Sequence, residues 1–156
     1  MTKMIRLRDV TENDLSIFFE QQHDPVANLM AAFPARTKDA FITHWTTKIL
    51  CDEAALKKTI LFGEAVAGNI LSWQPDDKRL VGYWIGKEYW GKGIATKALA
   101  EFLSLYKMRP LYAHVAKHNA GSIRVLEKSG FTISSHGTIF STVHGHEVED
   151  ILMVCT

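Results

Sequence analysis

Residues Gly82–Ala98 restrict the possible folds more than any other stretch of the chain; they read GYWIGKEYWGKGIATKA. The first of them are apolar and aromatic, as in a buried strand, and the last begin an apolar-periodic helix. Gly91 and Gly93 lie between the two, and glycine allows positive φ and close approach of a ligand to the backbone. A strand, a glycine loop and a helix start leave backbone N–H groups free, and Lys92 and Lys97 add positive charge. We therefore expect an anionic group to bind at this loop.

The residue pattern of the rest of the chain changes near Leu56, from mostly helix-forming to mostly strand-forming. Before it, we expect a strand over 4–8 and three short helices, which begin at the N-cap Thr11, at Pro25 and at Asp39. After it, alternating residues predict an antiparallel meander over 57–62, 65–74 and 79–85. Then follow the helix from 94, a strand over 111–116, a helix over 119–128, and strands over 131–135, 138–143 and 147–154. This order predicts a mixed α+β fold.

Length and composition favour one soluble domain over residues 1–156. The formal net charge of +1 gives no sign of a nucleic-acid or membrane-surface partner. The start of the chain lacks the apolar run of a signal peptide, and Cys51 and Cys155 have no metal-knuckle or CxxC spacing. We expect a cytoplasmic protein in a reducing compartment, with no metal.

Two other phosphate-binding loops come close to the pattern at Gly91–Gly93. A P-loop would carry Ser or Thr after the lysine, where this chain has Gly93, and it belongs to parallel sheets. A dinucleotide fingerprint would end on glycine, where this chain has Thr96. If the two glycines are considered alone, a loop with only a structural role remains an alternative. A second motif is needed to distinguish it from a ligand-binding loop.

That second motif is Asn119–Phe131, which reads NAGSIRVLEKSGF. Together with the Gly82–Ile85 run and Tyr89–Thr96, it resembles the GNAT superfamily of N-acetyltransferases, most closely the branch that includes the ribosomal-protein N-terminal acetyltransferases. The resemblance covers the chain from about Leu56 to its end. It implies a GNAT-type fold: a mostly antiparallel sheet of about seven strands, flanked by helices, with one splayed parallel pair formed by 79–85 and 111–116.

The resemblance also implies how acetyl-CoA would bind as the cosubstrate. Its pantetheine arm would pair with the strand end, and its pyrophosphate would lie on the N–H groups of the loop and helix start. The cofactor-binding residues implied are Trp84, Ile85, Gly86, Trp90, Gly91, Lys92, Gly93, Ile94, Ala95, Thr96, Asn119 and Ser122. Asn119 also suits a helix N-cap, and Ser122 also suits a helix-start serine that bonds to backbone.

For catalysis, the resemblance implies that a side chain near Ser122 donates a proton to the departing thiolate. A general base has to take the proton of the amine, whose pKa in water is about 10.4 for a lysine-type amine. The branch often carries Glu at the position of Leu80, so the base is sought elsewhere. His114 is our candidate, because alternation with Tyr112 and Ala116 is compatible with a position facing the cleft; a core or surface histidine is the alternative. The other candidates are Glu88, His118, Glu147 and Asp150.

The predicted function is direct transfer of an acetyl group from acetyl-CoA to a primary amine, with no covalent enzyme intermediate. The alternative is a non-catalytic acyl-CoA-binding protein with the same fold. The acceptor is a small-molecule or peptide amine, in a pocket to which Phe33, Phe41 and Trp45 of the early helices contribute. Dimers are common in the resembling branch, so a homodimer is an open expectation.

Overall fold

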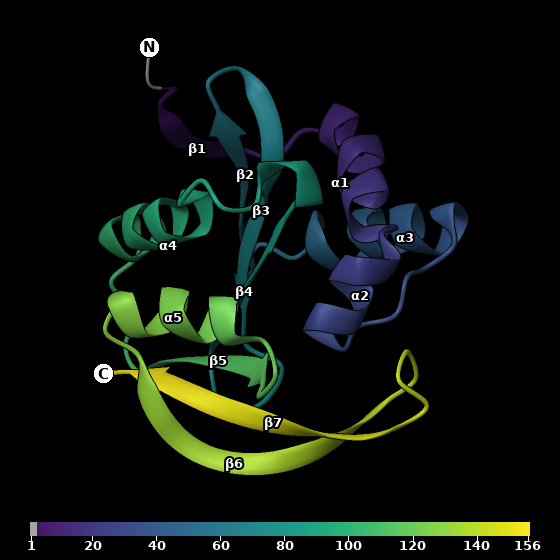
Figure 1. Cartoon of the computed structure of the whole chain (residues 1–156). Helices are drawn as coiled ribbons and strands as arrows, with labels where there is room; N and C mark the ends of the chain where they lie inside the picture. Colours follow the sequence, from purple (N-terminus) through teal and green to yellow (C-terminus); the bar gives the residue numbers. More distant parts are fainter. Residues whose placement is uncertain (1–2) are drawn as a thin grey trace.

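The computed structural model of the chain describes residues 3–156 (Figure 1). Residues 1 and 2 of the expected 1–156 domain lie outside this range. The described residues form a seven-stranded sheet of order β1-β2-β3-β4-β5-β7-β6. Its strands are β1 Ile5–Asp9, β2 Leu56–Phe62, β3 Ala65–Trp73, β4 Leu80–Ile85, β5 Leu111–Ala116, β6 Thr132–Ser141 and β7 His146–Cys155. Every neighbouring pair is antiparallel except β4 and β5, so the predicted fold is confirmed.

The parallel pair separates almost as soon as it forms. Leu80 on β4 and Tyr112 on β5 are the one register pair between the two strands within the described range. Beyond that point the edge of β4 has no strand beside it, although its backbone N–H and C=O groups still need hydrogen-bond partners. The predicted splay is therefore present, and it opens toward the glycine loop.

Helices cover both faces of the sheet, with α4 and α5 on one side and α1, α2 and α3 on the other (Figure 1). Their bounds are α1 Leu15–Gln22, α2 Pro25–Ala31, α3 Lys38–His44, α4 Ile94–Leu105 and α5 Ala120–Lys128. The main core joins the apolar face of α4 to the sheet: Ala98, Leu99 and Phe102 are fully buried against Ile60 and Ile70. This packing fixes where the N-terminus of α4 lies.

A second core lies under α1 and α3 and contains Leu15, Phe18, Phe41 and Trp45. Phe41 and Trp45 were expected to contribute to an acceptor pocket, but they are only 2% and 4% exposed; Trp45 packs on Phe18, and Phe41 packs on Trp45. Phe33 is different: it is partly exposed, and its ring meets Trp84 edge-on at 6.2 Å between centroids. Of these three aromatics, Phe33 alone reaches strand β4 by ring contact.

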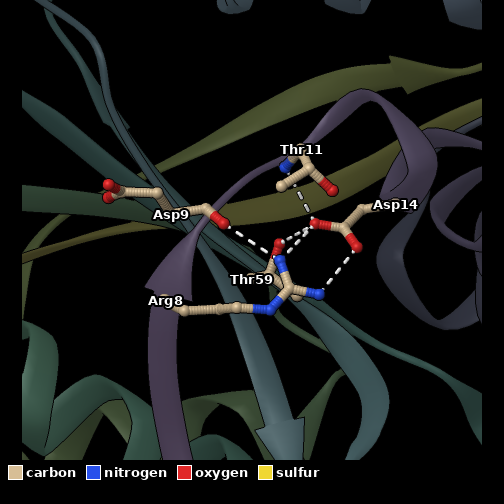
Figure 2. A network of polar contacts seen from close by, with 5 residues as sticks. All are labelled: Arg8, Asp9, Thr11, Asp14 and Thr59. Carbon is tan, nitrogen blue, oxygen red and sulfur yellow. Dashed lines mark hydrogen bonds and ion pairs between the residues drawn. The ribbon is translucent and has the colours of Figure 1, made fainter.

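A buried carboxylate fastens the start of α1 to the sheet (Figure 2). Asp14 accepts two hydrogen bonds from Arg8 of β1, at 2.7 and 2.8 Å, and one from Thr59 of β2 at 2.7 Å. The backbone N–H of Thr11 adds a fourth at 2.9 Å, the half of a capping box that the spacing predicts. Burial alone raises the pKa of Asp14, but these donors outweigh it and lower the pKa to about 2.

Two elements differ from their prediction. The strands expected over 131–135 and 138–143 are one strand, β6, because Gly137 lies in the ladder opposite Asp150 instead of making a turn. The register slips once within β6, between Ile133 and Ser135. The helix expected over 39–51 is α3 followed by a wider π-helical turn over Trp45–Ile49, where threonine hydroxyls donate to carbonyls one turn back.

None of the helices within residues 3–156 is long and apolar enough to cross a membrane.

Candidate functional site

A cavity of about 460 Å³ opens where β4 and β5 diverge. Its walls come from the end of β4, the glycine loop, the first turns of α4 and α5, and one side of α2. Mostly apolar walls with a few convergent polar groups are typical of sites for small organic ligands. The strand–loop–helix stretch that restricts the fold therefore also forms most of this site.

The glycine loop presents bare backbone to the cavity. Gly91 and Gly93 have φ of +77° and +75°, and a Cβ built on either would meet no atom within 4 Å. Gly93 is the N-cap of α4, and no side chain within the described residues caps this helix. The first N–H groups of α4 are thus left for a ligand, at the positive end of the helix dipole. Both glycines thus have the positive φ and the open surroundings that the sequence analysis expects of this loop.

Most of the predicted cofactor-binding residues line this cavity. They are Trp84, Ile85, Trp90, Gly91, Gly93, Ile94, Ala95, Thr96, Asn119 and Ser122. The structure does not bring Gly86 and Lys92 into the lining. Gly86 is buried under Gln21 of α1 and donates its N–H to the carbonyl of Ala67 at 2.8 Å, while Lys92 is exposed to solvent. Trp90 is held over the loop, since its indole N–H donates to the Ile85 carbonyl at 2.9 Å.

Asn119 and Ser122 lie at the start of α5. The Asn119 side chain accepts the N–H of Ser122 at 3.3 Å, so it caps the helix and lines the cavity at the same time. The Ser122 hydroxyl lies 2.7 Å from the hydroxyl of Tyr83, which comes from β4 across the cavity. Burial raises the pKa of Tyr83 to about 12, so this phenol keeps its proton at any ordinary pH.

Tyr83 is a site residue that the sequence reasoning did not select. The signal for Tyr83 was its place in the Gly-Tyr-Trp run, directly before Trp84. Alternation sends the two side chains to opposite faces of the sheet, and both line the cavity because it opens at the strand edge. Three residues of α2 also line the cavity: Ala27, Met30 and Ala31. Nothing in the local sequence of α2 indicates that it docks there.

His114 does not line the cavity; its neighbours Ala113 and Val115 face the core under α4 and α5, so His114 lies on the other face of β5, beside the same splay. Its side chain is 56% exposed, and its Nδ1 is 2.7 Å from a carboxylate oxygen of Asp150 on β7. Asp150 is itself buried, with 10% of its side chain exposed. Two of the predicted base candidates thus form one hydrogen-bonded pair.

The other base candidates lie apart from that pair. Glu88 and Glu147 are exposed, on the loop after β4 and at the start of β7. His118 lines the cavity and donates its Nε2 proton to the carbonyl of Leu29 at 2.9 Å. Its ring also contacts His144 of the β6–β7 turn, 5.3 Å between centroids. Within residues 3–156, no group of three or more His, Cys, Asp or Glu side chains is placed to hold a metal ion.

Comparison with known proteins adds a family and a set of similar folds. The family model described as "Acetyltransferase (GNAT) domain" matches residues 5–132. No curated protein matches the chain. Among solved structures, a GNAT-family acetyltransferase from Bacillus anthracis has a TM-score of 0.81 at 14% identity, covering 99% of this chain and 95% of its own.

Two further structures are similar over nearly their whole length. Spermidine N-acetyltransferase from Vibrio cholerae, in complex with CoA and spermine, has a TM-score of 0.80 at 17% identity, covering 96% of this chain and 95% of its own. A microcin C7 self-immunity acetyltransferase, in complex with acetyl-CoA and AMP, has a TM-score of 0.78 at 16% identity, covering 96% and 91%. At such identities the likeness establishes the fold.

Proposed function

The chain belongs to the GNAT acetyltransferase family, and we propose that it transfers an acetyl group from acetyl-CoA to a primary amine by direct attack. The observation that carries the proposal is the cavity at the β4–β5 splay, with the bare loop of Gly91 and Gly93 at the uncapped start of α4. The ribosomal-protein N-terminal acetyltransferase branch remains our expectation from the sequence motifs.

The residues present suit acetyl-CoA on structural grounds. A Cβ at Gly91 or Gly93 would stand in open space inside the cradle, so glycine here leaves room for a bulky phosphate group. The first N–H groups of α4 would hold the pyrophosphate. The splayed edge of β4 near Ile85, whose carbonyl also accepts the Trp90 indole N–H, would pair with the pantetheine amides. Crystals of two proteins with similar folds contain CoA or acetyl-CoA.

In this proposal Ser122 supplies the proton that the departing thiolate needs. Its hydroxyl lines the cavity and is 2.7 Å from Tyr83, a phenol that stays protonated. When the Tyr83 hydroxyl donates to Ser122 Oγ, the proton of Ser122 is free to point into the cavity. His114, on the other side of the splay, takes the proton of the amine.

The acceptor is an amine that reaches the sheet face of His114. One protein of similar fold is a spermidine N-acetyltransferase whose crystal structure holds spermine. For this chain we propose the wider class, a small-molecule or peptide primary amine. One catalytic domain over 1–156 and a cytoplasmic location complete the proposal, and a homodimer stays open.

A second candidate function is acyl-CoA binding without catalysis. It is favoured by Leu80, which occupies the position where the resembling branch often carries a glutamate base. Both candidates use the same cavity, so affinity for acetyl-CoA does not separate them.

Measuring turnover distinguishes the acetyltransferase from the acyl-CoA-binding protein. Purified protein is mixed with acetyl-CoA and, one at a time, a polyamine, an aminoglycoside, free amino acids and peptides with free N-termini. Free thiol and acetylated product are measured in parallel. The proposed enzyme releases thiol only with a competent amine and in equal amount to the product, and Ser122→Ala slows it. Saturable acetyl-CoA binding with no thiol release on any amine would establish the binding protein instead.

A further inference from the structure

Asp150 is a buried carboxylate whose one side-chain partner within the described residues is His114. Removing a carboxylate from water is costly unless hydrogen bonds or charges replace the lost hydration. Here a single contact of 2.7 Å to the Nδ1 of His114 does so. The imidazole of His114 is therefore the side chain that stabilises the buried carboxylate of Asp150.

The register of the sheet explains why the two side chains meet. Asp150 on β7 lies opposite Ala116 on β5, and His114 lies opposite Leu152. Asp150 and His114 are thus diagonal neighbours on one face, a distance that long side chains bridge. The contact is built into the strand pairing and does not depend on a flexible loop.

The direction of the hydrogen bond determines which imidazole nitrogen is free. A carboxylate oxygen accepts, so Nδ1 of His114 carries the proton. In the neutral ring, Nε2 is then left with its lone pair. Because the His114 side chain is 56% exposed while that of Asp150 is 10% exposed, the imidazole is accessible and its partner is not. This arrangement suits a pair in which buried Asp150 orients the ring and exposed His114 reacts.

The position of His114 suits the reaction proposed above. β4 and β5 are paired at Leu80 and Tyr112, and two residues further along lie Gly82 and His114, where the strands begin to separate. Tyr83 and Ser122 lie on the α5 side of this opening. His114 lies on the other face of the sheet, where the indole of Trp73 covers Gly82 of β4.

We propose that Asp150 is a positioning residue that fixes His114 in the tautomer with a free Nε2, so that Nε2 serves as the general base for the acceptor amine. The inference rests on the proposed acetyl transfer. It assigns Asp150, a base candidate from the sequence, to a role in which it touches His114 and not the substrate.

The proton balance is simple. As the bond between the amine nitrogen and the acetyl carbon forms and the carbon–sulfur bond breaks, the amine proton passes to Nε2. The leaving sulfur takes a proton from Ser122, which is restored from solvent. The charged imidazolium then lies 2.7 Å from the Asp150 carboxylate until it returns its proton to water.

The test uses two isosteric substitutions on the same strand. Asp150→Asn removes the charge beside His114 and offers an amide that can donate to the ring. Glu149→Gln is the matched control, because Glu149 points to the other face of β7 and pairs with Lys117 at 3.1 Å. For each protein, kcat, KM for acetyl-CoA and thermal unfolding are measured. Nitrogen NMR of the His114 ring, assigned with His114→Gln, reports the tautomer without any turnover.

The expected result is a wild-type ring with the proton on Nδ1, and a shift toward the Nε2–H form in Asp150→Asn. kcat of that variant falls by about a hundredfold, in the range of general-base catalysis, while KM for acetyl-CoA is unchanged. Glu149→Gln keeps the wild-type tautomer and kcat. A wild-type ring protonated on Nε2, or an Asp150→Asn variant with undiminished kcat, would overturn the inference. If no amine is acetylated, the proposed function fails, and the wild-type tautomer still decides the geometry.

Discussion

The ion pair between Arg8 and the buried carboxylate of Asp14 allows a quantitative prediction about the free energy of unfolding. Asp14 is 3% exposed and accepts four hydrogen bonds, two of them from one guanidinium (Figure 2). Its pKa is about 2 in the folded protein, against an ordinary value of 3.8. At about 1.4 kcal/mol per pKa unit, this difference is worth about 2.5 kcal/mol of folding free energy.

The sign follows from linkage. The folded-state pKa is lowered, so the contribution is complete above the unfolded value of 3.8 and is lost as pH falls toward about 2. Asp14→Asn removes the charge and keeps the shape. We expect it to lower the free energy of unfolding by about 2.5 kcal/mol near neutral pH, and by progressively less as the solution becomes acidic.

The measurement is urea unfolding, followed by tryptophan fluorescence, of wild type and variant across the acid range. Asp9→Asn is the matched control: Asp9 pairs with Lys58 at the same 2.7 Å but is 89% exposed, so solvent screens the pair and little change is expected. The reasoning is refuted if the difference between wild type and Asp14→Asn stays constant as pH falls, or if Asp9→Asn costs as much.

Two further predictions concern the cavity. Gly93→Val and Gly145→Val each place a branched side chain at a φ near +75° and should each lose at least about 1–2 kcal/mol of stability in urea unfolding. Only Gly93→Val should weaken acetyl-CoA binding in calorimetry, by about tenfold or more, because Gly145 lies in the β6–β7 turn; equal affinities would contradict the cradle. Tyr83→Phe keeps the ring and loses one hydrogen bond to Ser122, so kcat should fall by about five- to tenfold at constant KM for acetyl-CoA. An unchanged kcat in steady-state assays would show that Tyr83 only packs.

Local signals in the sequence predicted the fold well where the physics is local. Asp24 caps α2 through hydrogen bonds from Val26 and Ala27, and Pro25 takes the first helical position. Gly130 has φ of +93° after α5, as the helix stop predicts. The break expected between the strands 131–135 and 138–143 is absent, because Gly137 pairs with Asp150 in the ladder between β6 and β7.

The candidate site was predicted only where its residues are neighbours in the sequence. The loop residues are contiguous, so their spacing indicates that they lie together, and the structure places most of them along one cavity. Tyr83 and Ser122 are 39 residues apart, and His114 and Asp150 are 36 apart, so neither pair leaves a periodic trace. Asp150 could be recognised as a charged residue on a strand, but only the register of β5 with β7 reveals its partner.

The most direct test of the account follows the acetyl group itself. Enzyme in excess is mixed with acetyl-CoA that carries a labelled acetyl group, together with an amine found competent in the panel, and the reaction is stopped at successive times. Direct attack predicts that label leaves acetyl-CoA and appears on the amine at the same rate, with none bound covalently to the protein. Label on the protein before the product, or label that never leaves acetyl-CoA, would contradict the central claim.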